Sequence, residues 1–453
     1  MEMLLTEIAK AVSGKLYGGD LAISAVSIDT RTLEKADLYI AIKGPNFDGH
    51  TFIDKAKHAG AAALLLEQKC GAELPQIVVK DTHLALAVLA GAWKKKAKVK
   101  TVAVTGSNGK TTVKEMIAEI LKVDARVLFT QGNFNNDIGV PLTLLKLQQV
   151  HEYAVIEMGA NHIGEIAYSS QYAQADVAVI TNASAAHIEG FGSLDGIAKA
   201  KSEIISGLDR DGITILNRDD EFYGFWAEIA EDRKIISFGG HKSADVRAKD
   251  IKPTVENNQF ITQFVLSTGE AEVIINLALA GQHNVINALA AAASCLALGV
   301  ELQQIKQGLE KMQPVTGRLQ PFVGKKGNLI IDDTYNANPS SVEAALDVLM
   351  QCEGEPWFVM GALAELGKES VKKHQQLGEL IKLKKVEKLL TIGSDAESTS
   401  HSYGRGAIFF NSHEELIVYL EQKLNGNETV LIKGSRSQKM ERVVEAIVTD
   451  FRI

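Results

Sequence analysis

The stretch TVAVTGSNGKTTVKEM, residues 101–116, decides the fold of the central part of this chain. It begins with a short apolar run, turns through two glycines, and continues with a lysine and two threonines. Apolar residues then recur at helical spacing, at Val113, Met116, Ile117, Ile120 and Leu121. Strand, glycine loop, lysine, hydroxyl and helix follow one another in the order of a phosphate-binding loop.

The residue types in this loop suit a bound phosphate group. Gly106 and Gly109 let the backbone direct its N–H groups toward an anion, and the N-terminus of the following helix adds partial positive charge. Lys110 can reach the β- and γ-phosphates, and the hydroxyl of Thr111 can hold Mg²⁺. The predicted nucleotide contacts in this segment are Thr105, Gly106, Ser107, Asn108, Gly109, Lys110, Thr111 and Thr112.

The glycine spacing departs from that of a standard phosphate loop. The standard pattern GxxxxGK[ST] places more residues between its glycines than the two that separate Gly106 from Gly109. The alternative is a glycine turn before a helix that happens to carry a lysine. The strand, the helix and the paired threonines favour the phosphate loop.

A second acid belongs with this loop. The run YAVIE predicts a strand that ends at Glu157. Ligands of open parallel sheets bind at the carboxyl ends of strands, and Mg²⁺ prefers oxygen ligands. Glu157 is therefore a predicted Mg²⁺ ligand, with an ordinary strand-end carboxylate as the alternative.

Composition restricts the class of protein. The 453 residues are 46% hydrophobic and 23% charged with a net charge of −8, which indicates a globular protein and argues against general binding to nucleic acid or anionic membranes. The three cysteines form no CxxC pair, so we expect neither disulfides nor zinc but a reducing cytoplasm. No apolar run approaches the length of a membrane span, and the N-terminal residues do not resemble a signal peptide.

Alternating strand and helix patterns predict an α/β protein of three domains. We expect a small α/β domain over residues 1–82 and a parallel-sheet, phosphate-loop domain over 83–313, with a hairpin-rich insertion between about 245 and 279. Two prolines and a glycine in MQPVTGRLQPF, residues 312–322, mark the next boundary. A Rossmann-like domain is expected over 314–453.

Longer motifs, taken in order along essentially the whole chain, resemble those of the Mur ligases of bacterial peptidoglycan synthesis. They are IDTR, AIKGPNFDGH, TGSNGKTT, GNFNNDIGVP, EMGANHIGEI, AAHIEGFGS, GRLQP, DDTYNANP, ALAELG and LIKGSRSQKME. Two of them, DDTYNANP and GNFNNDIGVP, look like the branch of the family that adds a D-Ala-D-Ala dipeptide. One departure is Ala362 in GALAELG, where many Mur ligases carry an acid, and it argues against a metal or dipeptide role at that position.

The resemblance implies an ATP-dependent carbon–nitrogen ligase of the cytoplasm that serves cell-wall synthesis and division. Such an enzyme joins D-Ala-D-Ala to UDP-MurNAc-tripeptide through an acyl phosphate, giving UDP-MurNAc-pentapeptide, ADP and phosphate. The first domain would bind the UDP part, the second ATP and Mg²⁺, and the third the dipeptide. We expect a monomer that neither binds nucleic acid nor inserts into a membrane; lysine or meso-diaminopimelate at peptide position three stays open.

The resemblance also assigns catalytic and metal-binding roles. Lys201 aligns with the lysine that Mur ligases carbamoylate, which would supply an anionic oxygen ligand for a hard metal, while Lys199 is the alternative on the same helix. His187, at the end of the predicted strand ITNASAAH, resembles a histidine near the second Mg²⁺, although a structural histidine is more common. The catalytic residues implied are Lys110, His187, Lys201 and Arg318, and the metal ligands are Thr111, Glu157, His187 and Lys201.

Four further nucleotide contacts follow from the resemblance. His283 and Asn287 in GQHNVINALAA would contact the adenine, with helix capping as the alternative. Arg318 in TGRLQP would reach the phosphates from the third domain, because a guanidinium fork suits phosphate oxygens. Asp333 aligns with the acid that contacts the ribose, and Asp332 beside it is the alternative.

Substrate contacts implied by the resemblance are spread over all three domains, and for each the alternative is a loop residue that satisfies the local backbone. The residues are Thr30, Arg31, Lys43, Phe47 and Asp48 for the UDP part, Asn135 and Asn136 in the central domain, and Tyr335, Asn336, Asn338, Lys433, Ser435 and Arg436 in the third.

Other interpretations make different predictions. GFGSLDG, residues 190–196, has the glycines of a dinucleotide fingerprint, but no predicted strand runs directly into it. A related amide ligase, such as the one that adds the third peptide residue or a folylpolyglutamate synthetase, would use another acceptor. A P-loop ATPase would hydrolyse ATP without an acceptor amine, and an inactive protein would only bind the UDP-sugar.

Overall fold

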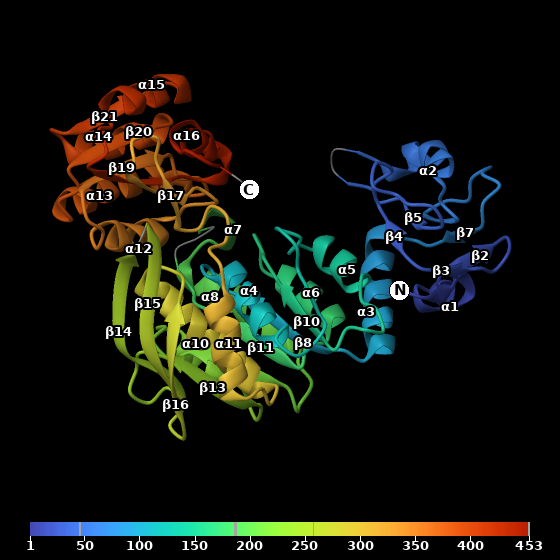
Figure 1. The fold of residues 1–453 in the computed structure, drawn as a ribbon. Coiled ribbons are helices and arrows are strands. Elements are labelled where there is room, and N and C mark those ends of the chain that lie inside the picture. The colour runs from blue at the N-terminus through green and yellow to red at the C-terminus, as the bar shows by residue number, and fades with distance from the viewer. Residues whose placement is uncertain (45–46, 185–187, 257, 452–453) are drawn as a thin grey trace.

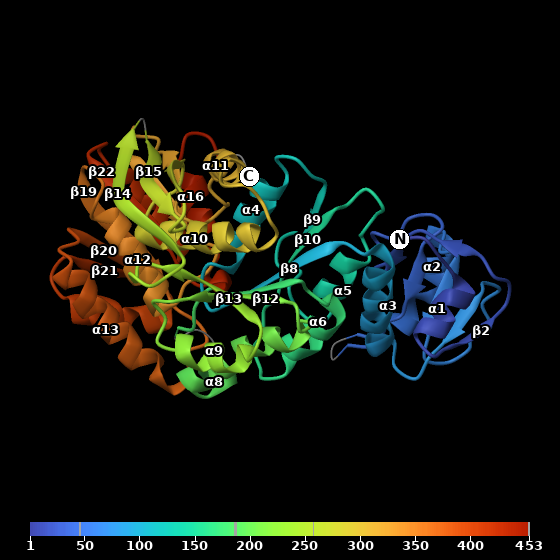
Figure 2. The ribbon, with the colours of Figure 1, turned by 90° about the horizontal axis from the view of Figure 1, so that it is seen from below.

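The structure is a computed structural model that describes residues 1–44, 47–184, 188–256 and 258–451. Three large sheets, covered by helices, follow one another along the chain (Figure 1). The N-terminal unit lies at one end of the molecule and the C-terminal unit at the other, with the central unit between them (Figure 2). The predicted α/β class is confirmed, and the exact domain boundaries stay a prediction.

The N-terminal unit is built on a five-stranded sheet in the order β2-β7-β6-β5-β4, in which only β2 is antiparallel to its neighbour. A two-stranded ribbon of β1 and β3 lies beside it. The elements are β1 (Met3–Leu4), α1 (Leu5–Ala11), β2 (Lys15–Tyr17), β3 (Ala22–Ile23), β4 (Val26–Ser27), β5 (Leu38–Ile40), η1 (Gly49–Phe52), α2 (Ile53–Ala59), β6 (Ala63–Leu66) and β7 (Gln76–Val78).

Helix α3 (Thr82–Ala97) connects this unit to the central one. Its first turn is capped by Asp81, whose carboxylate accepts a hydrogen bond from the backbone N–H of Leu84 at 2.9 Å. Near its other end the indole of Trp93 donates to the carbonyl of Leu147 at 3.1 Å. The buried face of α3 belongs to a hydrophobic cluster that contains residues of both the N-terminal and the central unit.

The central unit carries a nine-stranded sheet in the order β16-β15-β14-β13-β12-β11-β8-β10-β9. The strands predicted around the phosphate loop are all present, whereas β9 is too short for its pattern to have been recognised. The predicted hairpin between residues 245 and 279 is real, but it is not a separate insertion. Its first strand, β14, pairs parallel with β13, and β15 and β16 extend the same sheet antiparallel. The strands are β8 (Lys100–Thr105), β9 (Val127–Phe129), β10 (Tyr153–Glu157), β11 (Val177–Ile180), β12 (Ile213–Asn217), β13 (Lys234–Gly239), β14 (Val246–Glu256), β15 (Gln259–Ser267) and β16 (Glu272–Leu277).

The helices of the central unit follow the apolar pattern of the sequence. The five residues that predict one face of α4 are all fully buried, and the alanine-rich body of α10 packs in the same cluster. The helices are α4 (Lys110–Leu121), α5 (Gly139–Leu144), α6 (Glu165–Ala173), α7 (Ile188–Phe191), α8 (Leu194–Ser202), η2 (Glu203–Gly207), α9 (Tyr223–Ala230), α10 (Gln282–Ala297) and α11 (Leu302–Lys311).

The C-terminal unit has a six-stranded sheet in the order β17-β18-β22-β19-β20-β21, parallel except for the edge strand β17. Phe260 of β15 packs into its hydrophobic core, so the end of the central hairpin supports this unit. The elements are β17 (Gln320–Val323), β18 (Leu329–Asp333), α12 (Pro339–Leu349), β19 (Glu355–Gly361), η3 (Gly367–Glu369), α13 (Ser370–Leu383), β20 (Lys388–Ile392), η4 (Ser394–Ala396), α14 (Glu397–Tyr403), β21 (Ala407–Phe410), α15 (His413–Lys423), β22 (Glu428–Lys433), η5 (Arg436–Gln438) and α16 (Glu441–Ile447).

Candidate active site

A cavity of about 540 Å³ lies where the central and C-terminal sheets face each other. The segments that follow β8, β10 and β11 form one wall, and those that follow β18, β19 and β22 form the other. The connections of the neighbouring strands β8 and β10 run in opposite directions along the sheet, from β8 through α4 to β9 and from β10 through α6 to β11. Ligands of open α/β sheets bind at such switch points. Predicted site residues in the cavity wall are Ser107, Asn108, Gly109, Lys110, Thr111, Thr112, Asn135, Asn136, Glu157, Lys201, His283, Asn287, Arg318, Asp333, Tyr335, Asn336, Asn338 and Lys433.

The glycines of the loop are required by its conformation and by its neighbours. Gly106 has φ +149° and Gly109 has φ +81°, both of which L-residues rarely adopt. A Cβ on Gly106 would lie 1.9 Å from the hydroxyl oxygen of Thr181, and one on Gly109 would lie 2.3 Å from Oδ1 of Asn287. Protein side chains therefore occupy the space on the outer side of the loop, which keeps the loop in one shape.

Lys110 begins helix α4 and folds back over its own loop. Its Nζ donates to the backbone carbonyls of Gly106 at 2.7 Å and Ser107 at 3.2 Å. Burial lowers the pKa of this ammonium group, whereas the carboxylate of Glu157 opposes that shift. Thr105, in contrast, lies outside the cavity wall, because its hydroxyl donates to the carbonyl of Met158 at 2.8 Å.

Glu157 ends β10 inside the cavity wall, and its side chain is buried. Oε1 accepts a hydrogen bond from Nδ2 of Asn135 at 2.8 Å, whereas Oε2 is buried with no partner among the described residues. A buried carboxylate oxygen without a donor is unfavourable unless a cation or another donor reaches it. Together with the Thr111 hydroxyl, this oxygen fits a Mg²⁺ site that keeps several waters.

No group of three or more His, Cys, Asp or Glu side chains suited to a metal occurs in the described part of the chain. Structural zinc sites usually take four such ligands, and the described residues offer no such set. A hard ion held by few protein oxygens is compatible with this donor set.

Lys201, and not Lys199, lies in the cavity wall. On helix α8 Lys201 is 2% exposed, whereas Lys199 is exposed to solvent. Its Nζ lies 5.2 Å from the ring centroid of Phe191. Burial, reinforced by the charge of Lys110, lowers the pKa of Lys201 to about 7, so a large fraction of this amine is neutral near neutral pH.

Arg318 brings the C-terminal unit to the phosphate loop. Its Nη2 donates to Oγ1 of Thr111 at 3.0 Å, and its guanidinium carbon lies 4.3 Å from the ring centroid of Tyr335. Its Nε is buried with no partner among the described residues. A guanidinium with unused donors beside the loop is suited to phosphate oxygens.

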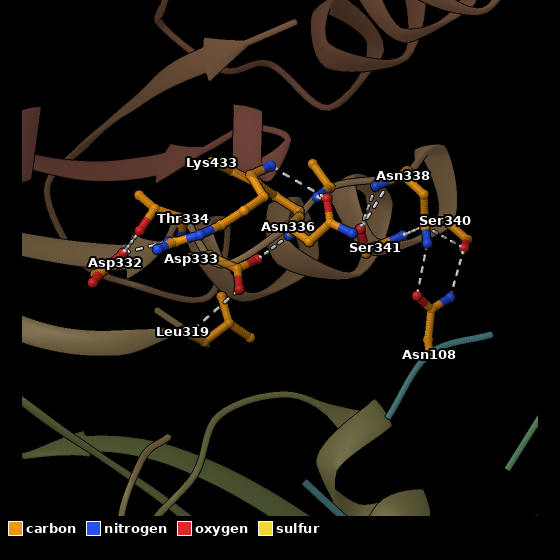
Figure 3. A network of polar contacts seen from close by, with 12 residues as sticks. Asn108, Leu319, Asp332, Asp333, Thr334, Asn336, Asn338, Ser340, Ser341 and Lys433 are labelled. Atoms are coloured by element: carbon orange, nitrogen blue, oxygen red, sulfur yellow. Dashed lines mark hydrogen bonds and ion pairs between the residues drawn. The ribbon is translucent and has the colours of Figure 1, made fainter. Parts of the chain in front are cut away.

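The two neighbouring acids of β18 point to opposite sides of the sheet (Figure 3). Asp333 lies in the cavity wall and its Oδ2 is 2.5 Å from Nζ of Lys433, at the end of β22. Asp332 is fully buried and accepts hydrogen bonds from the backbone and hydroxyl of Thr334. Burial raises the pKa of Asp332 to about 6, and it takes no part in the cavity.

The start of α10 forms another part of the cavity wall. Asn287 donates from Nδ2 to Oδ1 of Asn284 at 3.1 Å, and Asn284 donates to the carbonyl of Ala280. Neither side chain caps the helix, since its N-cap residue is Gly281. Burial lowers the pKa of His283, which favours the neutral ring.

The predicted substrate residues of the N-terminal unit do not line this cavity. They follow the carboxyl ends of the adjacent parallel strands β4 and β5 instead. Arg31 is bound to the carboxylate of Asp29 at 2.6 Å, and Asp48 accepts from the backbone N–H of His50 at 2.9 Å. Phe47 is 54% exposed. These residues therefore form a separate group, away from the phosphate loop.

Two predicted residues of the C-terminal unit also lie outside the cavity wall. Ser435 is buried and its hydroxyl accepts from the backbone N–H of Ala364 at 2.6 Å. Arg436 is exposed and lies 3.5 Å from Glu441. Ala362 is buried, and its Cβ would lie 2.8 Å from a Cβ added to Gly393, so this glycine leaves room for it.

His187 lies outside the described residues. Strand β11 ends at Ile180, so the prediction that the strand extends through ITNASAAH was wrong. The segment 190–196 contains the junction of α7 and α8, where the Ser193 hydroxyl caps α8 by accepting from Gly196 at 3.0 Å. Among the described residues, helix α7 and not a strand leads directly into this segment, whereas a dinucleotide fingerprint follows a strand.

Comparison with known proteins covers nearly the whole chain. The family descriptions "Mur ligase family, catalytic domain", "Mur ligase middle domain" and "Mur ligase, glutamate ligase domain" match residues 22–94, 104–295 and 317–436. The UDP-N-acetylmuramoyl-tripeptide–D-alanyl-D-alanine ligase of Escherichia coli is 42% identical over 99% of this chain and 98% of its own length.

The chain belongs to the Mur ligase family.

Solved Mur ligase structures share the arrangement described above. A crystal structure of MurF from Acinetobacter baumannii matches 98% of both chains with 37% identity and a TM-score of 0.93. MurF from Thermotoga maritima in complex with ADP matches 93% of this chain and 96% of that chain, with 29% identity and a TM-score of 0.82. As a Mur ligase, the protein is an ATP-dependent carbon–nitrogen ligase.

Sequence reasoning missed several residues of this Mur ligase site. Asn182 and Ser184, just beyond β11, line the cavity and hold the phosphate loop, and Ser340 lines it from α12. The position of Asn182 at the carboxyl end of a central strand was the available signal. Ser340 gave no such signal, because its partner is far away in the sequence.

No helix in the described part of the Mur ligase chain is long and apolar enough to cross a membrane.

Proposed function

We propose that this Mur ligase joins D-Ala-D-Ala to UDP-MurNAc-tripeptide in peptidoglycan precursor synthesis. The relatives that match the full length carry the name of this reaction. The structural observation that supports it is one cavity in which Lys110 and Thr111 face Asp333 and Lys433 of another unit. A ligase needs such a site, because ATP must meet both a carboxylate and an amine.

In this proposal the phosphates of ATP bind to the loop 105–112, held by backbone N–H groups and by Lys110. Arg318 would leave the Thr111 hydroxyl and donate to phosphate oxygens instead. Asp333 would accept from the ribose, and the segment with His283 and Asn287 would contact the adenine. The T. maritima MurF complex with ADP is consistent with nucleotide binding in such a chain.

The proposed Mg²⁺ ligands are Thr111, Glu157 and a carbamoylated Lys201, with His187 near a second ion. The ion would neutralise phosphate charge as it develops during transfer. Glu157 supports this role because its buried Oε2 has no partner among the described residues, and Asn135 orients the carboxylate through Oε1. Asn135 thus acts on the metal ligand, in addition to any contact with substrate.

Carbamoylation of Lys201 requires a neutral amine, because the nitrogen lone pair attacks CO₂ and a proton is then released. A pKa of about 7 makes that form available near neutral pH. The product carries a negative charge in place of a positive one, which would relieve the repulsion from Lys110. Burial would protect the carbamate from water.

The proposed reaction proceeds in two steps. The carboxylate of the tripeptide substrate attacks the γ-phosphorus of ATP, so that a new P–O bond forms and ADP leaves. The amine of D-Ala-D-Ala then attacks the acyl carbon, the tetrahedral intermediate loses phosphate, and the new amide nitrogen releases a proton. Lys110 and Arg318 would stabilise the phosphoryl charge throughout, which is the main requirement of phosphoryl transfer.

The other substrates would be bound by the outer units. Thr30, Arg31, Lys43, Phe47 and Asp48 would hold the UDP part at the carboxyl ends of β4 and β5. Asn136 would add a contact from the central unit. The dipeptide would bind among Tyr335, Asn336, Asn338, Lys433, Ser435 and Arg436.

Since the UDP-binding residues do not line the cavity, a rigid-body approach of the N-terminal unit would complete the site.

We propose that the units are residues 1–82, 83–313 and 314–453, that the protein is a monomer, and that it acts in the cytoplasm. Light scattering in solution would test the oligomeric state.

Phosphate release tests the proposed reaction. The purified protein is incubated with ATP, Mg²⁺ and UDP-MurNAc-tripeptide, with and without D-Ala-D-Ala. We expect release only when both substrates are present, together with UDP-MurNAc-pentapeptide in the mass spectrum. Release that ignores the dipeptide would instead identify an ATPase, and no release with either the lysine or the meso-diaminopimelate tripeptide would identify another amide ligase or an inactive binding protein.

A further inference from the structure

The side chain of Asn108 links the phosphate loop to the C-terminal unit (Figure 3). Its Oδ1 accepts a hydrogen bond from Nδ2 of Asn338 at 2.8 Å, across 230 positions of sequence. Its Nδ2 donates to the hydroxyl of Ser340 at 3.1 Å. Both partners belong to the start of α12, so one amide fastens that helix to the loop.

The same amide is anchored on the central side. Nδ2 of Asn108 also donates to the hydroxyl of Ser184 at 2.8 Å, and the backbone N–H of Ser184 donates to the hydroxyl of Ser107 at 3.0 Å. The backbone N–H of Asn108 donates to Oδ1 of Asn182. Both polar atoms of the Asn108 side chain are therefore hydrogen-bonded to other protein side chains, and these bonds hold the amide in an orientation that contacts the start of α12.

The other end of this connection lies at the proposed dipeptide site. Asn338 begins α12, and the segment before it contains Tyr335, over which Arg318 lies. The carbonyl of Asn336 accepts from Nζ of Lys433 at 3.0 Å. A shift of the start of α12 would thus move the residues proposed to hold the second substrate.

We propose that Asn108, Asn338 and Ser340 form an interdomain latch that positions segment 335–341 for the second substrate when the phosphate loop has its nucleotide-binding shape. In this role Asn108 is a positioning residue and not a nucleotide contact. The latch explains why a polar amide lies in the loop with its side chain turned toward another unit. With such a latch, ATP bound to the loop would favour binding of the dipeptide. This assignment of substrate rests on the proposed function, whereas the latch itself is a property of the described contacts.

Ser341, in the first turn of α12, provides a matched control for the latch variants. Asn338 both joins the latch and caps α12, because its Oδ1 accepts from the backbone N–H of Ser341 at 2.9 Å. Replacing Asn338 would therefore remove both the hydrogen bond to Asn108 and the N-cap of α12. The Ser340 hydroxyl accepts from Asn108 within the latch. Among the described residues, the Ser341 hydroxyl bonds to Asn338 alone, accepting from its N–H at 3.0 Å and donating to its carbonyl. Ser341→Ala thus weakens the cap without removing a bond to Asn108.

The kinetic test uses the full-length variants Asn108→Ala, Ser340→Ala, the double variant and Ser341→Ala. We expect Asn108→Ala to raise KM for D-Ala-D-Ala about tenfold, because this factor corresponds to the loss of one or two hydrogen bonds. The dissociation constant of ATP should change less than about twofold. Ser340→Ala should raise the same KM by a smaller factor. The double variant should raise this KM by less than the product of the two single effects, because both single changes remove the bond between Asn108 and Ser340, although Ser340→Ala also removes contacts with Asn338 and Ser184.

A second readout is independent of ligase activity. Hydrogen–deuterium exchange of the amides in segment 335–341 should accelerate in Asn108→Ala and Ser340→Ala with ATP bound, while the last turns of α12 remain protected. Equal loss of ATP and dipeptide binding in Asn108→Ala would overturn the latch in favour of a direct nucleotide contact. The same KM increase in Ser341→Ala as in Ser340→Ala would overturn it in favour of simple helix destabilisation. Unchanged exchange would also overturn it, whereas wild-type protein that releases no phosphate would count only against the proposed function.

Discussion

Nη2 of Arg318 lies 3.0 Å from Oγ1 of Thr111, which joins residues 207 positions apart and from different units. The contact brings an arginine of the C-terminal unit to the hydroxyl that is proposed to hold Mg²⁺. The central and C-terminal units therefore already meet at the proposed nucleotide site. In the proposed mechanism, the predicted UDP-binding residues of the N-terminal unit must still approach it.

Arg318→Ala should reduce kcat/KM for ATP by about 10- to 100-fold, because a charge-assisted hydrogen bond contributes roughly 1.5–3 kcal/mol. Arg318→Lys should recover only part of the loss, since an ammonium group lacks the planar fork. Steady-state kinetics with varied ATP measure both effects. Arg442→Ala is the control, because Arg442 pairs with Glu414 on the surface. Equal activity of the alanine and wild-type proteins would contradict the role of Arg318.

Lys201→Ala should abolish ligation, whereas Lys199→Ala on the same helix should retain it, because only Lys201 lines the cavity. Isotopically labelled CO₂ should give an NMR carbamate signal in the wild-type protein and in Lys199→Ala, but not in Lys201→Ala. Added bicarbonate should increase wild-type activity more strongly below pH 7, where less of the amine is neutral. A carbamate signal that persists in Lys201→Ala would place the modification elsewhere.

The unmodified amine of Lys201 should also reduce the stability of the fold. Its pKa falls from 10.5 to about 7 on folding, so the penalty for a buried charge is complete below pH 7 and disappears as the pH approaches 10.5. In CO₂-free buffer, Lys201→Met should therefore raise the free energy of unfolding by a few kcal/mol at pH 7, and by less at pH 9. Denaturant titrations at the two pH values measure this difference, and a gain that grew with pH would contradict it.

Local pattern was enough to predict the parts of the site that depend on one element. The spacing of apolar residues after Gly109 predicted α4, and the end of YAVIE predicted the position of Glu157. The α/β class also followed from alternating strand and helix patterns. These features depend on contacts within a short segment or on the general geometry of α/β sheets.

The structure was needed to decide which of two neighbouring residues of the same type belongs to the site. Asp332 and Asp333 point to opposite faces of a strand, and Lys199 and Lys201 to different faces of a helix, so pattern alone could not distinguish the members of each pair. The orientation of Asn108 was not predictable either, because its partners Asn338 and Ser340 are far away in the sequence. Such pairings are set by the packing of whole units.

Asn135→Ala should raise the Mg²⁺ concentration needed for half-maximal activity by about 10- to 100-fold, since it removes the donor that orients Glu157, the proposed metal ligand. Glu157→Gln should have a larger effect on the Mg²⁺ requirement. Asn133→Ala is the control, because Asn133 is exposed in the same loop. Activity titrated with MgCl₂ measures these values, and an unchanged requirement in Glu157→Gln would exclude this carboxylate as a ligand.

Gly109→Ala should weaken ATP binding at least about tenfold, because left-handed backbone strain of about 1–2 kcal/mol favours another shape of the loop. The added Cβ would also lie 2.3 Å from Oδ1 of Asn287, which must then move away from the loop. Gly224→Ala, in helix α9, is the control, because no heavy atom lies within 4 Å of its added Cβ. This change should leave ATP binding intact and raise the stability of the fold slightly. Calorimetric titration with ATP measures the affinities, and thermal melts show whether each variant is folded. Wild-type affinity in a folded Gly109→Ala protein would mean that the left-handed turn is not needed to bind phosphate.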